Sequence, residues 1–237
     1  MCKKTLLTLT VLALASLTAF AASKDGIVLS KDGRMVTATQ PTKSTAQRPP
    51  SDEGLVKIYD SIGTAYPKGT YWCCEGATIF GPTAISGEPE YWEAGAFTPT
   101  ADHTVTKVEV AVGYVEGFNG LVVGLYSDAS GLPGKAIKSW AVTNLPNFGS
   151  CCAVVGASDS NGISITANTQ YWIVVKTAAK SSNTFAAWNV EDVDQVDSEL
   201  TAFWCSDDKG GSCGSDNDVW VAGQAIPGHA FAVLGSK

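Results

Sequence analysis

The chain has 237 residues, a formal net charge of −7 and a charged fraction of only 16%. An acidic, lightly charged surface repels phosphate backbones and anionic headgroups, so nucleic acid and anionic membranes are not expected as partners. The 24 glycines and the hydrophobic fraction of 45% are typical of a turn-rich globular β protein.

Residues 1–21 are predicted to be a signal peptide. Lys3 and Lys4 give a positive start, Leu6–Phe20 is a short apolar run, and Ala19-Phe20-Ala21 offers a small-residue cleavage pattern. The apolar run is too short to span a bilayer, and no later stretch approaches that length. We therefore expect a secreted protein without membrane insertion, whose formal charge changes from −7 to −9 when the two lysines are removed.

Residues 22–53 are predicted to be a flexible linker or tail, because they are polar, contain Pro49-Pro50 and lack a sustained apolar period. Within them Ser23-Lys-Asp-Gly26 recurs as Ser30-Lys-Asp-Gly33, which could close a weak hairpin around Ile27-Val28-Leu29. From residue 54 to 237, strand-like runs alternate with turn residues, which indicates a single β domain.

The pair Asn119-Gly120 predicts a two-residue hairpin turn between extended runs at 105–115 and 121–126. The first run is apolar at the even positions from Val108 to Tyr114, and the second at the odd positions from Leu121 to Leu125. Both sets would face the same core in the register that the turn imposes. Ser130-Gly131-Leu132-Pro133-Gly134 predicts a second turn, before a third strand at 136–142. These elements predict an antiparallel, jelly-roll-like β-sandwich.

Three short motifs in this stretch resemble the bacterial choice-of-anchor R domain proteins. They are Gly124-Leu125-Tyr126-Ser127-Asp128, Gly131-Leu132-Pro133-Gly134 and Asn168-Thr169-Gln170-Tyr171-Trp172. The resemblance covers roughly residues 94–190 and implies a β-sandwich in a secreted or surface context, with no catalytic residues to transfer. Members often end in an anchoring segment, whereas this sequence stops at Val233-Leu-Gly-Ser-Lys237 without one, which favours free secretion over anchoring.

Six of the seven cysteines follow the predicted signal, and an even number in an exported chain indicates disulfides. Cys205 and Cys213 bracket a short glycine-containing loop and are the easiest pair to join. Either Cys73 or Cys74 is expected to bond either Cys151 or Cys152. One such bridge is easier than two, because successive strand side chains point to opposite faces.

No cofactor is expected. Adjacent cysteines do not offer the spacing of structural zinc ligands, and no Cys-x-x-Cys redox motif occurs. Acidic residues in the last third of the chain could hold calcium, although no calcium-loop motif is present. The weak candidate ligands are Asp207, Asp208, Asp216 and Asp218.

Seven tryptophans offer the other candidate sites. Trp140, Trp172 and Trp188 lie within apolar strands and are expected in the core. Trp72, Trp92, Trp204 and Trp220 neighbour turns, cysteines or charges, so one or more could be exposed. Of these, Trp92, Trp204 and Trp220 are the candidate ligand-binding residues, because exposed aromatic faces hold sugar rings in many binding modules.

A hydrolase is the alternative. Glu88, Glu90 and Glu93 beside Trp92 could supply a glycosidase acid pair, which needs two carboxyl groups at a defined separation. His103 and His229 lie in no catalytic motif and are expected in loops. The sequence thus favours a secreted, non-enzymatic module that binds polysaccharide or another cell-surface component, with a glycan-acting hydrolase as the competing hypothesis.

Overall fold

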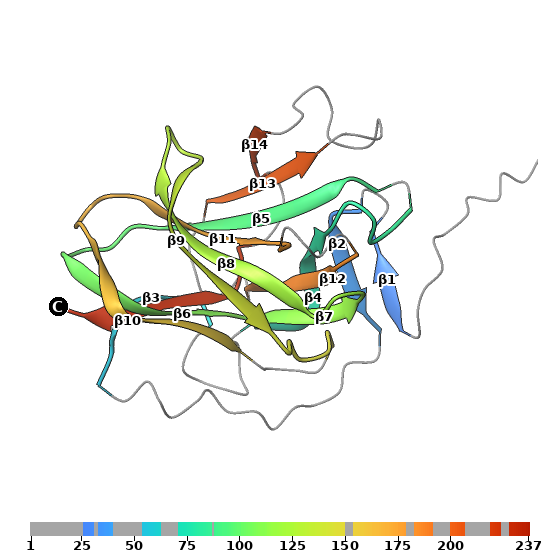
Figure 1. The fold of residues 1–237 in the computed structure, drawn as a ribbon, viewed down its shortest axis with the longest axis horizontal. Helices are drawn as coiled ribbons and strands as arrows, with labels where there is room; N and C mark the ends of the chain where they lie inside the picture. The colour runs from blue at the N-terminus through green and yellow to red at the C-terminus, as the bar shows by residue number, and fades with distance from the viewer. Residues whose placement is uncertain are drawn as a thin grey trace, which may run out of the picture.

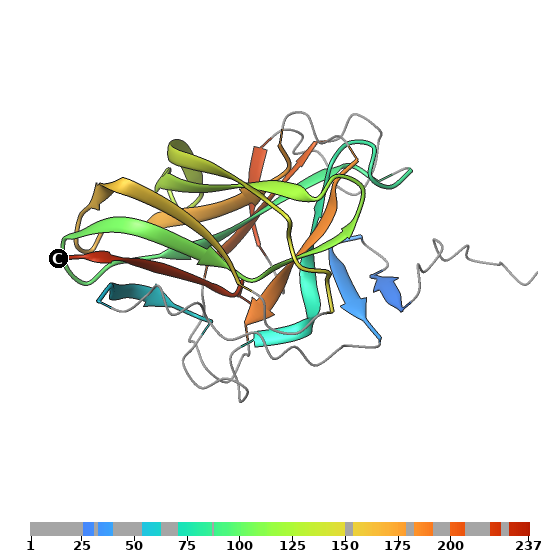
Figure 2. The same ribbon diagram turned by 60° about the horizontal axis from the view of Figure 1, so that its bottom comes forward.

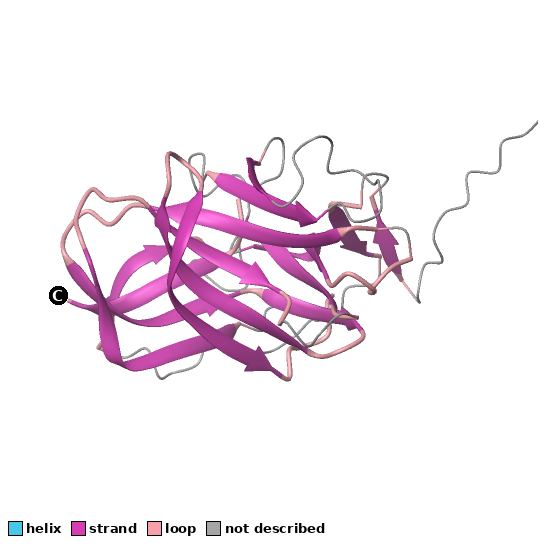
Figure 3. Ribbon diagram, turned by 45° about the horizontal axis from the view of Figure 1, so that its top comes forward, coloured by secondary structure: helices cyan, strands magenta, loops and turns pink. Residues whose placement is uncertain are grey.

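The computed structural model is an all-β protein, and the residues that it describes contain no helix (Figure 3). The described ranges are 26–30, 33–39, 54–62, 71–86, 88–149, 154–178, 183–191, 200–206, 219–223 and 228–237. The predicted signal peptide lies outside them. In this part of the chain no helix is long and apolar enough to cross a lipid bilayer.

Fifteen strands make up the described structure. They are β1 (Ile27–Leu29), β2 (Met35–Ala38), β3 (Val56–Asp60), β4 (Tyr71–Phe80), β5 (Glu90–Phe97), β6 (His103–Val110), β7 (Val112–Glu116), β8 (Gly120–Asp128), β9 (Pro133–Thr143), β10 (Val155–Ile165), β11 (Tyr171–Lys176), β12 (Phe185–Glu191), β13 (Thr201–Ser206), β14 (Val219–Ala222) and β15 (Phe231–Ser236).

The strands form two antiparallel sheets that pack as a β-sandwich (Figures 1 and 2). The larger sheet has 11 strands, with β1-β2-β4-β5-β11-β8-β9 as its main path; β12 and β7 extend it from β4, and β13 and β14 from β5. The smaller sheet has the order β10-β6-β15-β3. The predicted β-sandwich is therefore confirmed.

The main core lies between the sheets and contains the inward-facing residues that the alternation predicted. Val108, Val110 and Val112 are buried in it together with Leu121, Val123 and Leu125 from β8. Alternation thus identified correctly which side of each strand is buried.

The predicted hairpin at Asn119-Gly120 is wrong. β7 pairs with β12, whereas β8 pairs with β9 and β11. The predicted first strand is interrupted at Ala111, so that β6 belongs to the small sheet and β7 to the large one. Neither Asn119 nor Gly120 has the positive φ that a type I′ turn requires; the positive φ of 80° falls on Gly117 instead.

Asn119 acts through its side chain rather than as a turn residue. Its Oδ1 accepts a hydrogen bond of 2.6 Å from the Leu145 amide, and its Nδ2 donates one of 3.1 Å to the Leu145 carbonyl. These two bonds hold the segment that follows β9 against the start of β8.

Strand structure begins before the predicted domain boundary at residue 54. β1 and β2 form the antiparallel hairpin indicated by the Ser-Lys-Asp-Gly repeat, and each repeat ends in a positive-φ glycine, at Gly26 and Gly33. β2 then pairs with β4, and Val36 is fully buried in a second core cluster. Part of the segment predicted as a flexible linker or tail therefore belongs to the folded domain. Its strands of three and four residues are too short to show a sustained apolar period.

Asp128, the last residue of β8, joins three segments of the chain. Its Oδ1 accepts hydrogen bonds from Trp172 Nε1 (2.9 Å) and Gln170 Nε2 (2.7 Å), while its Oδ2 accepts one from the Gly131 amide (3.1 Å). Burial opposes ionisation, but the hydrogen bonds outweigh it and hold the pKa of Asp128 below its usual range. This carboxylate fixes the turn before β9 and the start of β11 at once.

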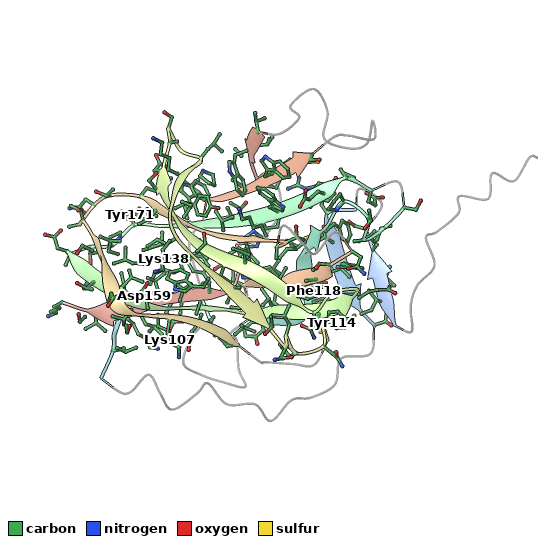
Figure 4. The ribbon with its side chains drawn as sticks, viewed as in Figure 1. Lys107, Tyr114, Phe118, Lys138, Asp159 and Tyr171 are labelled. Atoms are coloured by element: carbon green, nitrogen blue, oxygen red, sulfur yellow. The ribbon has the colours of Figure 1, made fainter. Side chains whose placement is uncertain are left out.

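A further contact joins the two sheets at one edge of the sandwich. Lys138 Nζ of β9 lies 2.7 Å from Asp159 Oδ2 of β10, and the two labels lie close together in Figure 4. The hydrogen bond from Lys138 is the main reason that the pKa of Asp159 is lowered. The pair connects the last strand of the large sheet to the small sheet.

We predict that Asp128→Ala lowers the free energy of unfolding by about 2–4 kcal/mol, because it removes three hydrogen bonds to a charged acceptor. Asp128→Asn should lose about half as much, since its amide oxygen still accepts. Guanidinium unfolding at pH 7 measures both. The control is Lys135→Ala, an exposed position on the same hairpin, which should change stability by less than about 0.5 kcal/mol. Equal stability of all three variants would contradict the role of Asp128.

We predict that Gly117→Ala is far more damaging than Gly131→Ala, although both glycines have positive φ. A Cβ at Gly117 would lie 1.7 Å from the Asn183 carbonyl oxygen, whereas one at Gly131 meets nothing within 4 Å. Gly131→Ala should therefore cost only the backbone strain of about 1–2 kcal/mol. Gly117→Ala should exceed 3 kcal/mol in the same unfolding measurement. Similar losses at both positions would refute this packing around Gly117.

Candidate functional site

Three tryptophans form a row across adjacent strands of the large sheet. Trp204 on β13 lies opposite Trp92 on β5 and opposite Trp220 on β14. The Trp92 and Trp204 rings stack with centroids 3.8 Å apart and planes 17° apart, and Trp220 lies 6.5 Å from Trp92. Figure 1 shows β13 beside β5 and β14 beside β13. All three candidate ligand-binding residues are thus brought together, each partly exposed.

Lys176 continues this row on the other side of β5. It is the last residue of β11, and its Nζ lies 4.7 Å from the centre of the Trp92 ring. Trp204 approaches Trp92 from β13, and Lys176 approaches it from β11. The Trp92 ring is therefore held between an aromatic ring and a cation, an arrangement favoured by the negative potential of the ring face.

A cavity of about 470 Å³ opens beside Trp92. Its walls come from β5, β8, β9 and β11 and from the segments that follow β4 and β11. They are formed by Pro82, Glu90, Trp92, Val122, Ser139, Lys176, Thr177 and Ala178. The volume is within the range of small-molecule sites, and apolar walls with a few polar groups are typical of them.

Glu90 is the acidic group of this cavity, and its position is fixed by two donors. Trp92 Nε1 donates to Glu90 Oε1 at 2.9 Å, and Thr177 Oγ1 donates to the same oxygen at 2.6 Å. These two bonds do not use the other carboxylate oxygen. The lysine retains its three N–H donors, because a cation–π contact uses the charge rather than a hydrogen bond.

Glu93 points away from this cavity, toward the small sheet. It is almost completely buried, and its Oε2 lies 3.3 Å from Nε2 of the fully buried His229. The His229 ring stacks on Trp188 with centroids 4.4 Å apart. Burial raises the pKa of Glu93, while His229 and the Arg34 charge act in the opposite direction. The side chains of Trp92 and Glu93 therefore lie on opposite faces of β5.

The three glutamates considered for a hydrolase do not converge. Glu90 lines the cavity and Glu93 lies behind the sheet. Glu88 lies against Gly33 of the N-terminal hairpin, where its Oε2 would be 2.6 Å from a Cβ at that glycine. Among the described residues that line the cavity, Glu90 is the one carboxylate.

The structure tests the cysteine predictions in part. Cys205 is disulfide-bonded, but its partner's side chain lies outside the description, as do Cys151, Cys152 and Cys213. Cys74, one of the six cysteines expected to form disulfides, is a free thiol, and burial together with the Glu75 charge raises its pKa. The predicted bridge from Cys73 or Cys74 to Cys151 or Cys152 would therefore have to use Cys73, whose side chain is not described.

The proposed calcium ligands Asp207, Asp208, Asp216 and Asp218 lie outside the described residues. Within the ranges given above, no group of three or more His, Cys, Asp or Glu residues is arranged to hold a metal ion.

The remaining candidates fall mostly in the interior. Trp172 and Trp188 are fully buried, as predicted, and Trp140 packs against the main core while partly exposed. The side chain of Trp72 is outside the description. The expectation of loop histidines is wrong for His103, which begins β6. His229 forms an isolated bridge with Val190 before β15 and is fully buried.

Sequence reasoning missed the polar members of the site, Lys176, Thr177 and Ser139. Lys176 ends an apolar strand and Thr177 follows it, and Ser139 is one of several polar residues of β9. The register of β11 with β8 and β5 brings Lys176 to the tryptophan row, and the register of β9 with β8 brings Ser139 to the cavity. Comparison with models of protein families and with curated protein sequences yields no match for this chain.

We predict that Glu191 makes stability fall with rising pH. This glutamate at the end of β12 is 3% exposed, and burial raises its pKa from 4.5 to about 7. Its contribution to stability is therefore complete below pH 4.5 and is lost as the pH rises through about 7. Glu191→Gln should flatten this loss and stabilise the protein at pH 8 by up to about 3 kcal/mol. Urea unfolding between pH 4.5 and 8 measures it.

The control for this experiment is Glu75→Gln, because Glu75 is exposed on β4. This variant keeps Glu191, so its stability should still fall with rising pH. If Glu191→Gln behaves like this control, Glu191 is not the group responsible.

Proposed function

We propose that the protein is a secreted, non-enzymatic extracellular module that binds polysaccharide or another cell-surface component. The observation that carries this proposal is the cavity lined by Trp92, which is one end of the cross-strand row Trp92, Trp204 and Trp220. The same three residues were selected from the sequence as candidate ligand-binding residues.

The chemistry of the cavity suits a polyhydroxylated ligand. Val122, Pro82 and the exposed edge of Trp92 offer apolar surface for the C–H groups of a sugar ring, while Glu90 can accept hydrogen bonds from hydroxyl groups and Lys176 can donate to their oxygens. Ser139 and Thr177 add hydroxyl groups to the cavity wall.

The arrangement of acids favours binding over hydrolysis. A glycosidase of the usual kind needs two carboxyl groups flanking the bond, about 5–9.5 Å apart. Among the described lining residues the cavity offers Glu90, whose Oε1 is occupied by two donors. Glu93 lies on the opposite face of β5 and pairs with His229. The hydrolase alternative would need a second acid from elsewhere.

Export is part of the proposal. It is supported by the pattern of the first 21 residues and by the disulfide-bonded Cys205, since structural disulfides are typical of oxidising compartments. The motif resemblance to choice-of-anchor R proteins is consistent with a secreted sandwich, and we propose membership in that family on the same ground.

A glycan array with the mature protein, combined with a reducing-sugar assay on every bound glycan, tests this function. We expect binding without release of reducing ends, and Lys176→Met should weaken binding about tenfold or more. Lys135→Met, an exposed lysine that does not line the cavity, is the matched control and should bind as the wild type. Release of reducing ends would favour the hydrolase instead. Absence of binding would refute a glycan-binding role.

A further inference from the structure

We infer that the ligand of this site is a linear, uncharged oligosaccharide chain that lies across the strands of the large sheet. This inference rests on the proposed function and adds the length, direction and charge of the ligand. It follows from the alignment of the cavity with the tryptophan row.

The contact residues lie in one line across six strands. Register pairs Trp220 with Trp204 and Trp204 with Trp92. The Lys176 ammonium group lies over Trp92. Lys176 is in turn opposite Val122 on β8, which is opposite Ala141 on β9. The cavity occupies the part of this line from β5 to β9, and Trp204 and Trp220 continue it beyond β5.

The length of this line exceeds that of a monosaccharide site. Neighbouring strands are about 4.8 Å apart, so the three intervals from β9 to β5 span about 14 Å, and the Trp220 ring lies 6.5 Å from that of Trp92. A chain of several sugar units fits this distance, whereas a single ring fits within the cavity alone.

The charges at the cavity select a neutral chain. One acid, Glu90, and one cation, Lys176, line it, so the described wall has no net charge. The whole chain carries a formal charge of −7, which repels a polyanion at long range. A repeating uronic acid would bring a carboxylate beside Glu90, whereas a hydroxyl group can donate to Glu90 or accept from Lys176.

The two parts of the line then have different roles. Glu90, Lys176 and Ser139 contact the sugar unit in the cavity and recognise its hydroxyl groups. Trp220 lies just beyond the cavity, with its ring 6.5 Å from that of Trp92, and contacts a chain that extends past Trp92. Affinity should therefore rise with chain length, and Trp220 should contribute to long chains alone.

Calorimetric titration with two neutral series tests this inference. The probes are cello- and malto-oligosaccharides from the monosaccharide to the hexasaccharide, with oligogalacturonides of equal length as the acidic comparison. We expect affinity for one neutral series to rise beyond the disaccharide, with weaker binding of the acidic series. Trp220→Ala should weaken hexasaccharide binding about tenfold and leave disaccharide binding unchanged.

Two controls separate this effect from misfolding. Phe118→Ala removes an exposed aromatic residue outside the line (47% exposed) and should change neither affinity. Retained disaccharide binding by Trp220→Ala reports an intact cavity. If Trp220→Ala loses both ligands, the milder variant Trp220→Leu is measured, and equal losses for both chain lengths overturn the inference.

The outcomes distinguish the two proposals. Preference for oligogalacturonides, or an affinity that does not grow beyond the disaccharide, overturns the inference and leaves the binding function intact. Failure of the neutral series to bind, with binding of other glycans on the array, also overturns only the inference. Failure to bind any glycan refutes the function itself.

Discussion

The hydrogen bonds to the Asp128 carboxylate are the constraint on which the rest of the large sheet depends. They connect the end of β8, the turn at Gly131 and the approach to β11 through Gln170 and Trp172. Because β11 lies between β8 and β5, its position sets the register of both neighbours. A slip of one residue would turn every side chain of a strand to the other face. The alignment of Lys176 with Trp92 therefore depends on a carboxylate at the far end of the strand.

The sequence allowed the buried face of the runs at 105–115 and 121–126 to be predicted, but not the partners of these strands. Val112 and Leu125 both face the main core, as their alternation required, yet β7 pairs with β12 rather than with β8. A two-residue period of apolar side chains shows which face of a strand is buried. It does not show which sheet the strand belongs to, because both sheets of a sandwich bury an apolar face. The switch between sheets occurs at Ala111. Its amide N–H donates to the Ala230 carbonyl, and its carbonyl accepts a hydrogen bond from the Asn189 amide. No local pattern marks a bond to residues so distant in sequence.

The same limit applies to the candidate site. Trp92, Trp204 and Trp220 could be selected because each neighbours turns, cysteines or charges, and the structure places them in one row. Their polar neighbours could not, since Lys176 reaches Trp92 only through pairing between β11 and β5. Glu93 illustrates the opposite problem. In the structure it shares the inner face of β5 with the buried Tyr91 and Phe97, a position that is unusual for a charged residue and that sequence reasoning did not assign to it.

The buried Glu93 also explains how β5 can present Trp92 on its outer face. A strand that carries a binding residue must be held from behind, and Glu93 reaches His229 in the segment that leads into β15 of the small sheet. His229 stacks on Trp188, and Trp188 Nε1 donates to the Ala230 carbonyl at 3.0 Å, so β12 is tied to the same segment. A close contact between two buried polar side chains is specific for one arrangement of their strands. We therefore interpret the pair as the contact that fixes β5 relative to the small sheet, directly behind the cavity.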